Sequence, residues 1–324
     1  MKVRFSVLIP VYNRAEYTRQ AIDSVLSQVF TDYEVIVVDD GSTDETPRVL
    51  ESYGTRIKVF RQSNRGVEAA RNQAAALAQG EYLCMLDSDD LFLPHTLTTY
   101  DRIIRNCDSP PLVLGAFTRF EGDQPPPADS HMSAAIKVRK YPDYLSKDEP
   151  IDITNSKIVI RRSLFDEIEG YGSRDGRSTD RYDDYNLMLK AGTHGPCIVV
   201  EEPCTMVRRL HAMGSHVQNF DWVLDGILGM ARSERQGFYP GGKHRRGSRY
   251  AVIGGFAFWW ATTRFLWTRP KLAFRALWGT APMIAVALWR RALRCFRKPV
   301  PLIVLPALEL QGPPRAEKTE TNSS

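Results

Sequence analysis

The densest group of ionisable side chains is Asp87-Ser88-Asp89-Asp90, in which three carboxylates fall within four residues. Carboxylates this close repel one another unless a cation or ordered hydrogen-bond donors compensate them. Mg²⁺ and Mn²⁺ prefer carboxylate, water and phosphate oxygens, and they typically take only one or two protein carboxylates beside a diphosphate. The run therefore indicates a divalent-cation site for a phosphorylated ligand. Taken by itself, an acidic turn that caps the next helix is the simpler interpretation, so the surrounding sequence has to decide.

The segments that must position these acids alternate between strand and helix. Apolar, β-branched runs are typical of strands buried in a parallel sheet, and apolar residues three or four positions apart are typical of helices. Strands are expected at 3–11, 33–38, 57–61, 82–86 and 158–162, and helices at 15–28, 43–52, 66–79 and 181–191. Ser42 or Thr43 suits the cap of the second helix. Ligands of such sheets bind at the carboxyl ends of the strands, where Asp39-Asp40 and the run at 87–90 both fall.

Composition and charge narrow the class of protein. Of the 324 residues, 43% are hydrophobic and 25% are charged, as in folded globular proteins rather than disordered ones. The net charge of +5 is modest for this length, and nucleic acid is not expected as a partner. Five cysteines without a Cys-x-x-Cys pair indicate reduced thiols and a cytoplasmic protein. The apolar run 5–9 is too short for a signal peptide or anchor because Pro10 follows it.

The last third of the chain has a different character. From Arg232 to Lys298 there are fifteen Lys or Arg and a single acid, Glu234, which suggests contact with something anionic. Apolar aromatic helices are expected at 251–268 and 272–297, but each contains an arginine and Pro282 interrupts the second. An arginine at the centre of a bilayer costs about 2.5 to 3.5 kcal/mol, so helices lying in a membrane interface are favoured. A helical cap packed on the rest of the protein is the alternative.

Four motifs follow one another in the first part of the chain. They are Ser6-Val7-Leu8-Ile9-Pro10-Val11-Tyr12-Asn13, Val37-Val38-Asp39-Asp40-Gly41-Ser42-Thr43-Asp44, Asn64-Arg65-Gly66 with Ala70-Arg71-Asn72, and Gly80-Glu81-Tyr82 to Asp90. This order resembles the family 2 glycosyltransferases of the SpsA type, over roughly residues 3 to 215. The resemblance implies an α/β architecture with the GT-A (nucleotide-diphospho-sugar transferase) fold, in which helices flank a mixed, mostly parallel sheet. A C-terminal helical appendage would follow it.

The resemblance also divides the chain into parts. It implies a catalytic domain over 1–220 and leaves a basic, aromatic helical appendage over 221–300 and a tail over 301–324, which is expected to be disordered. The proline-rich segment 108–150 lacks recognisable features, and it is expected to form loops or edge strands on the acceptor side.

Specific roles follow from the resemblance for the residues that match its nucleotide-binding motifs. Pro10, Val11 and Tyr12 would contact the nucleotide base. Asp40 would hydrogen-bond a uracil-type ring, because a carboxylate can accept from a ring imide N–H; a turn cap is the alternative. Arg71 would approach the nucleotide or its phosphates with its donor fork, with a surface salt bridge as the alternative.

The resemblance assigns the metal and the reaction to later residues. Asp87 and Ser88 would lie near the ribose or donor sugar, and Asp89 would be the Mn²⁺ or Mg²⁺ ligand of the family's DxD element. His211, in a segment with Arg209 and Ser215 that would close over the diphosphate, could bind the metal or phosphate or be structural. Asp184 would be the catalytic base. Asp183 stands where the family usually has Glu, which leaves its role open, and the pair alone would be a charged helix start.

The function implied is transfer of a sugar from a nucleotide donor, with UDP favoured, to a saccharide or lipid-linked hydroxyl in cell-envelope or exopolysaccharide synthesis. Inversion and metal dependence are part of that implication. The Gln-x-x-Arg-Trp motif of processive synthases is absent from the sequence, which favours the addition of one sugar. A Rossmann dehydrogenase would need Gly-x-Gly-x-x-Gly where Pro10 to Asn13 stand, and a phosphoacceptor domain leaves Asp184 unexplained. An inactive sugar-nucleotide-binding scaffold is the remaining alternative. The protein is expected in the cytoplasm or, through residues 232–298, on the cytoplasmic face of the membrane.

Overall fold

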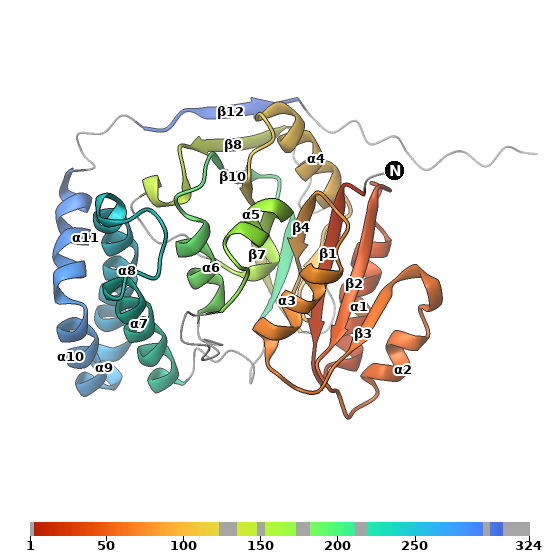
Figure 1. Ribbon diagram of the computed structural model, residues 1–324, viewed down its shortest axis with the longest axis horizontal. Coiled ribbons are helices and arrows are strands. Elements are labelled where there is room, and N and C mark those ends of the chain that lie inside the picture. The colour runs from red at the N-terminus through yellow and green to blue at the C-terminus, as the bar shows by residue number, and fades with distance from the viewer. Residues whose placement is uncertain are drawn as a thin grey trace, which may run out of the picture.

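The computed structural model describes residues 3–122, 135–147, 153–172, 182–210, 219–293 and 299–306 (Figure 1). The strands are β1 (Phe5–Val11), β2 (Tyr33–Asp39), β3 (Lys58–Arg61), β4 (Tyr82–Met85), β5 (Leu91–Phe92), β6 (Leu112–Leu114), β7 (Phe117–Glu121), β8 (Ile136–Tyr141), β9 (Ile158–Arg161), β10 (Cys197–Glu202), β11 (Met206–Leu210) and β12 (Leu302–Leu305). The helices are α1 (Ala15–Leu26), α2 (Thr46–Glu51), α3 (Val67–Leu77), α4 (Thr96–Asn106), α5 (Arg162–Glu167), α6 (Asp183–Ala191), α7 (Phe220–Arg235), α8 (Arg246–Trp260), α9 (Leu266–Thr268), α10 (Pro270–Gly279) and α11 (Ala281–Leu293). The strands and helices predicted in the catalytic part are confirmed, with small shifts at their ends. The expectation of loops or edge strands over 108–150 is wrong for β6, which lies inside the sheet between β10 and β9.

Nine strands form the central sheet in the order β12-β8-β10-β6-β9-β4-β1-β2-β3. The neighbours β4, β1, β2 and β3 run parallel, as do β6 and β10, whereas the other four pairings are antiparallel. The predicted mixed α/β sheet is confirmed, although parallel pairing accounts for half of it rather than most. Because β4, β1 and β2 are parallel neighbours, the loops that follow them lie together at the carboxyl ends of these strands.

Alternate residues of β1 enter two separate hydrophobic layers, as the period of a strand requires. Phe5, Val7, Ile9 and Val11 pack with α1, α2 and α4 on one face. Leu8 packs with α3, α5 and α6 on the opposite face. The sheet is therefore buried on both sides, which explains why its central strands read as continuous apolar runs.

The acidic run 87–90 lies in the loop between β4 and β5. Strand β5 pairs with β11, which pairs in turn with β7, and these three form a separate small sheet. Helix α4 begins only at Thr96. The run is therefore not the cap of the next helix, and the divalent-cation site stays a prediction. The predicted cap of α2 is also wrong: Asp44, not Ser42 or Thr43, accepts from the Thr46 backbone N–H at 2.9 Å.

The C-terminal helices are present as expected, but they share one hydrophobic core with the α/β part. The core cluster that contains Leu8 and α6 residues continues through Ile227, Phe256 and Met283 of α7, α8 and α11. Phe256 lies 4.5 Å from Tyr185 of α6 between ring centroids. Figure 1 shows these helices as a group beyond α6, with α10 and α11 outermost. The composition of the sequence changes near residue 220, but the hydrophobic core continues across this predicted boundary.

The expected disordered tail is wrong for residues 302–305. These form β12, which pairs antiparallel with β8 and thereby covers the edge of the sheet. Arg139 of β8 donates to the Val300 carbonyl at 2.5 Å, which fixes the approach of the strand. A sheet edge presents unpaired N–H and C=O groups, so even a short apolar run is stabilised there. The rest of the tail, from 307 on, lies outside the described residues.

Length and hydropathy decide whether a helix of the described residues could span a membrane. No single helix is long and apolar enough to cross a bilayer, and one pair, α10 with α11, passes by length and composition only, bent by 79°. The bend falls where Pro282 was expected to interrupt the helix.

Candidate active site

The first two motifs are tied together at the edge of the sheet. Asn13, at the end of the first motif, donates from its backbone to Ser42 Oγ at 3.0 Å and accepts from the Thr43 N–H at 2.7 Å. Its positive φ of 51° is one that asparagine tolerates better than most residues. Next to it, Pro10 and Val11 are buried, while the Tyr12 side chain is 46% exposed. Of the three predicted base contacts, Tyr12 offers the accessible surface.

Asp40 is buried and holds the next loop in place. Its carboxylate accepts from Gln62 Nε2 at 2.7 Å and from the backbone N–H groups of Arg65 and Gly66, both at 2.9 Å. Gly41, with φ of 83°, allows this approach, since a Cβ there would lie 2.9 Å from the Asn64 nitrogen. Asp40 thus organises loop 62–66, a role that sequence reasoning did not foresee, and its contact with a uracil-type ring stays a prediction.

The three carboxylates of the run 87–90 have different surroundings. Asp90 is buried, accepts from Ser156 Oγ at 2.6 Å and accepts from the Arg209 backbone N–H at 3.2 Å. Asp87 accepts from Arg71 Nη2 at 2.6 Å. Asp89 forms a short ion pair with Arg14, whose side chain is 37% exposed. Burial raises the pKa of Asp87 and of Asp90, and the charge of Asp89 raises both further. A nearby cation would relieve this repulsion.

Arg209 supports the loop from behind. Its guanidinium lies between the rings of Tyr17 and Phe120, at 4.7 and 4.5 Å from their centroids, and it donates to the Asp89 carbonyl at 3.3 Å. The side chain is buried and fixes the backbone that carries Asp89, whereas its place in a segment closing over the diphosphate stays a prediction. His211 and Ser215, from the same expected segment, lie outside the described residues.

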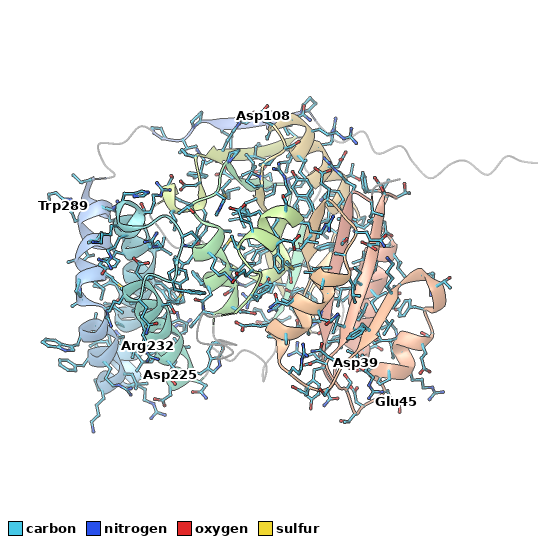
Figure 2. All side chains as sticks on the ribbon, viewed as in Figure 1. Asp39, Glu45, Asp108, Asp225, Arg232 and Trp289 are labelled. Carbon is cyan, nitrogen blue, oxygen red and sulfur yellow. The ribbon has the colours of Figure 1, made fainter. Side chains whose placement is uncertain are left out.

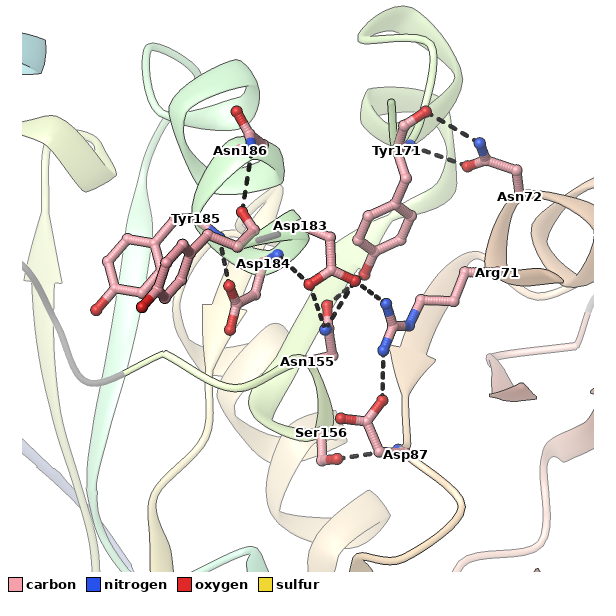
Figure 3. A network of polar contacts seen from close by, with 11 residues as sticks. Arg71, Asn72, Asp87, Asn155, Ser156, Tyr171, Asp183, Asp184, Tyr185 and Asn186 are labelled. Atoms are coloured by element: carbon pink, nitrogen blue, oxygen red, sulfur yellow. Dashed lines mark hydrogen bonds and ion pairs between the residues drawn. The ribbon is translucent and has the colours of Figure 1, made fainter. Parts of the chain in front are cut away.

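Arg71 links the acidic loop to the start of α6 (Figure 3). Its guanidinium is buried, donates to Asp87 and to Asp183, and lies 5.3 Å from the centroid of the Tyr171 ring. The alternative of a surface salt bridge is wrong, because the pairs are internal. The contact of Arg71 with nucleotide phosphates stays a prediction. The motif also explains Asn72, whose side-chain amide exchanges hydrogen bonds of 3.0 and 2.9 Å with the backbone of Tyr171.

Asp184 lies beside this network but forms no ion pair with Arg71. The Asp183 carboxylate accepts from the Asp184 backbone N–H at 2.9 Å, and Asp184 accepts from the Tyr185 N–H at 2.7 Å. Burial raises the pKa of the Asp184 carboxyl well above its ordinary value, and the charge of Asp183 raises it further. Tyr182, before this turn, has a left-handed φ of 60°, an uncommon conformation for a large side chain. A carboxyl whose pKa is raised in this way is suited to proton transfer.

Sequence reasoning missed several residues that complete the site. Asn155 and Ser156, in a 3-10 turn over Asn155–Lys157, donate to Asp183 and Asp90. Tyr171 donates to Asn155 Oδ1 at 2.7 Å. No local pattern marks these three. Arg14 could have been found, since it directly follows the first motif.

The buried pairs of Arg71 lead to a prediction about stability. Replacing Arg71 by Leu leaves Asp87 and Asp183 without their cation, and breaking a buried pair typically costs about 3–5 kcal/mol. Urea denaturation should therefore show that loss in the free energy of unfolding. Arg48→Leu is the matched control, because the Arg48 side chain is 86% exposed and its removal should change stability by less than about 0.5 kcal/mol. Equal stability of the two variants would contradict the internal role of Arg71.

The donor set fits a divalent cation only with help from a ligand. Among the residues that the structure describes, no group of three or more His, Cys, Asp or Glu side chains could hold a metal ion. Asp87 and Asp89 nevertheless stand two residues apart in one turn, and Mg²⁺ and Mn²⁺ often bind one or two carboxylates plus phosphate oxygens. The site therefore suits a cation that arrives with a diphosphate.

Comparisons with known proteins agree with this geometry. Residues 6–169 match the model of Glycosyl transferase family 2. An uncharacterized glycosyltransferase of Rickettsia typhi is 39% identical over 109 residues, 34% of each chain. The glycosyltransferase GlyG of Streptococcus pneumoniae is 30% identical over 125 residues, 37% of this chain and 41% of that protein. These matches therefore cover well under half of the relatives' length.

Solved structures show the same fold. Staphylococcus aureus TarS (residues 1–349), in complex with UDP-GlcNAc, superposes with a TM-score of 0.64 at 18% identity, over 88% of this chain and 81% of that one. The mannosyltransferase PcManGT of Pyrobaculum calidifontis, in complex with GDP-Man and Mn²⁺, has a TM-score of 0.52 at 17% identity, over 93% and 82% of the two chains. The predicted GT-A fold is confirmed, and the chain belongs to glycosyltransferase family 2.

Proposed function

We propose that this glycosyltransferase moves a sugar from a nucleotide-diphosphate donor, preferably a UDP-sugar, to a hydroxyl of a saccharide or lipid-linked acceptor, with inversion at the anomeric carbon. The observation that carries the proposal is the chain of contacts Asp87–Arg71–Asp183, which joins the acidic loop to the helix start that carries Asp184 (Figure 3). The two ends of that chain suit the two halves of the reaction, leaving-group binding and proton removal. The UDP-GlcNAc and GDP-Man complexes of TarS and PcManGT support a nucleotide-sugar donor.

The base acts on the acceptor. Asp184, as carboxylate, takes the proton of the acceptor hydroxyl while that oxygen forms a bond to the anomeric carbon. The bond between that carbon and the diphosphate oxygen breaks, and the nucleoside diphosphate leaves with the electron pair. Sugar transfer of this kind has a transition state with oxocarbenium character. The ion pair of Asp183 with Arg71 fixes the turn of backbone from which Asp184 projects.

The leaving group is held at the other end of the contacts. Asp89, with Asp87, would hold Mn²⁺ or Mg²⁺ together with the diphosphate, and such a cation stabilises the negative charge that develops on the leaving phosphate. Mn²⁺ in the PcManGT complex supports this cofactor class. His211 remains a proposed further contact. Tyr12 contributes an exposed ring against which a nucleotide base can stack.

The biological setting belongs to the same proposal. A saccharide or lipid-linked acceptor places the chain in cell-envelope or exopolysaccharide synthesis, acting in the cytoplasm or on the cytoplasmic face of the membrane. Free thiols at Cys84, Cys107, Cys197 and Cys204 are compatible with a reducing compartment.

Donor binding is the direct test of the proposed function. A ligand present at a hundred times its dissociation constant stabilises the native state by about 2.7 kcal/mol. Thermal unfolding is measured with UDP-, GDP- and dTDP-sugars, each with and without Mn²⁺. One donor, which we expect to be a UDP-sugar, should raise the unfolding temperature only when the metal is present. An inactive scaffold would show the rise in unfolding temperature only. An enzyme would also release product when a saccharide acceptor is added. The absence of any rise with all these donors contradicts the proposal.

A further inference from the structure

An apolar face lies open on the outermost helices of the chain. Its members are large side chains of α8 to α11, exposed by 37 to 82%: Trp259, Leu266, Trp267, Phe274, Trp278, Leu288, Trp289 and Leu293. Trp267 and Trp278 are the most exposed, at 82 and 76%. The helices that carry them pack on one another, and large exposed apolar side chains gathered in this way mark an interaction site. We call these eight residues the aromatic face.

The face belongs to helices that are firmly attached on their other side. Leu272, Ala273 and Ala276 of α10 and Met283 and Ile284 of α11 are buried in the shared core. Gly254 of α8 lets α11 come close, since a Cβ there would lie 2.2 Å from the Met283 backbone. Arg290 also donates to Ser248 Oγ at 3.0 Å. Each helix thus has one side packed on the protein and one apolar side left in water.

Basic side chains alternate with the aromatic ones along the same side of α10. Lys271, Phe274, Arg275 and Trp278 follow the spacing i, i+3, i+4 and i+7, which places them on one helix face, and all four are exposed. Phe274 and Trp278 stack at 6.1 Å between centroids. Figure 2 shows Trp289 of α11 pointing outward at this end of the molecule, on the opposite side from α2.

The charge of this region has one sign. The sequence contains no Asp or Glu between Arg235 and Leu308. Within the described residues, no ion pair involves Arg264, Arg269, Lys271, Arg275 or Arg291, and all five are exposed. By contrast, the basic residues of 232–249 include several that serve the fold: Arg249 is buried on Glu234, Arg245 pairs with Asp143, and Arg235 donates to the Gly279 carbonyl. Arg232 and Lys243 are exposed as well, but these five basic residues fall between positions 264 and 291, the stretch that carries most of the aromatic face.

We propose that the aromatic face and these five basic residues dock the enzyme on an anionic phospholipid bilayer, with α9, α10 and α11 lying in the interface. Tryptophan is favoured at the boundary between head groups and acyl chains, and arginine and lysine are attracted to anionic lipid. The surface narrows the expected membrane contact from residues 232–298 to 259–293. Docking is independent of catalysis.

The test is flotation of the full chain with vesicles of phosphatidylcholine containing phosphatidylglycerol, against phosphatidylcholine alone, without donor or acceptor. We expect the protein to float with the anionic vesicles, to be released by high salt, and to show a blue shift in tryptophan emission. Trp267→Ser with Trp278→Ser should abolish flotation, and Trp267→Phe with Trp278→Phe should restore most of it. Arg269→Gln with Arg275→Gln should weaken binding roughly 25-fold, at about fivefold for each charge.

The matched control is Arg48→Gln with Arg105→Gln, which removes two exposed arginines from α2 and α4 and should leave flotation unchanged. Failure of the unmodified chain to float, or equal flotation of the serine variant, overturns the proposal. A third outcome also overturns it: the unmodified protein is a dimer that does not bind vesicles, and the serine variant is a monomer. A second copy of the chain would then cover the aromatic face. Donor binding is measured separately, so either proposal can fail without the other.

Discussion

Replacing Asp184 by Asn should lower kcat by about two to four orders of magnitude while the donor still binds. A positioned general base contributes about 10²- to 10⁴-fold, and the amide of Asn cannot take a proton. Asn keeps the size of the side chain, and Asp184 makes no ion pair with Arg71, so the network that holds the acidic loop should survive. Steady-state kinetics with a saccharide acceptor measures kcat, and thermal stabilisation by the donor reports binding.

The pH dependence separates a base from a merely structural side chain. Because burial and Asp183 raise the pKa of Asp184, a growing fraction is protonated and inactive as the pH falls through that raised value. The acid limb of kcat should therefore lie well above the ordinary pKa of an aspartate, near 3.9, and the residual activity of Asp184→Asn should lack it. Asp221→Asn, an exposed acid in the first turn of α7, is the control and should keep both rate and pH profile. An unchanged kcat in Asp184→Asn would refute the base assignment.

The positions of the site residues could be predicted because they depend on local patterns. Apolar runs ending in acids placed Asp40 and Asp87 after parallel strands, and strands β1, β2 and β4 are adjacent in the structure. What joins these residues could not be predicted. Arg71 meets Asp183 across 112 positions of sequence, and Ser156 meets Asp90 across 66. Such pairings follow from how α3, β9 and α6 pack, which no local spacing encodes.

Counting charges in the sequence overestimated the basic surface. The basic stretch from Arg232 to Lys298 suggested contact with an anionic partner, yet its Arg249 forms a buried pair with Glu234 at 2.5 Å between α8 and α7. Arginine serves well in such internal pairs because its planar fork satisfies a carboxylate with two donors. Sequence alone does not distinguish it from a surface arginine, so only the fold shows which charges remain available.

The extent of the core was the other feature hidden from the sequence. Aromatic residues in the C-terminal helices suggested a separate appendage, but Tyr182 of the catalytic part packs on Trp222 and Phe256 of α7 and α8. Tyr239 also donates to Asn186 of α6 at 2.5 Å. The helices that carry the aromatic face are thereby connected through packed side chains to the helix that carries Asp184.

Replacing Asp89 by Asn should abolish metal-dependent donor binding and transfer. The structure distinguishes the three acids of the loop by their partners: Asp90 is bound to Ser156 and the Arg209 backbone, and Asp87 is held by the buried Arg71. Asp89 pairs with Arg14, whose side chain is 37% exposed, so a cation that arrives with the donor would compete with a guanidinium that is partly in solvent. Asp89 is therefore the carboxylate best placed to bind the metal.

Losing a residue that only orients a metal ligand costs 10- to 100-fold in affinity, so losing the ligand itself should cost more than about 100-fold. Titration of Mn²⁺ by electron paramagnetic resonance, with the donor present, measures this directly and does not depend on turnover. Asp166→Asn, an exposed acid of α5, should bind Mn²⁺ as the unmodified protein does. Arg14→Gln removes the cation that competes for Asp89 and should bind Mn²⁺ at least as tightly. The substitution Asp89→Asn leaves the partners of Asp87 and Asp90 in place. Unchanged Mn²⁺ affinity in this variant would therefore mean that Asp89 is not the metal ligand.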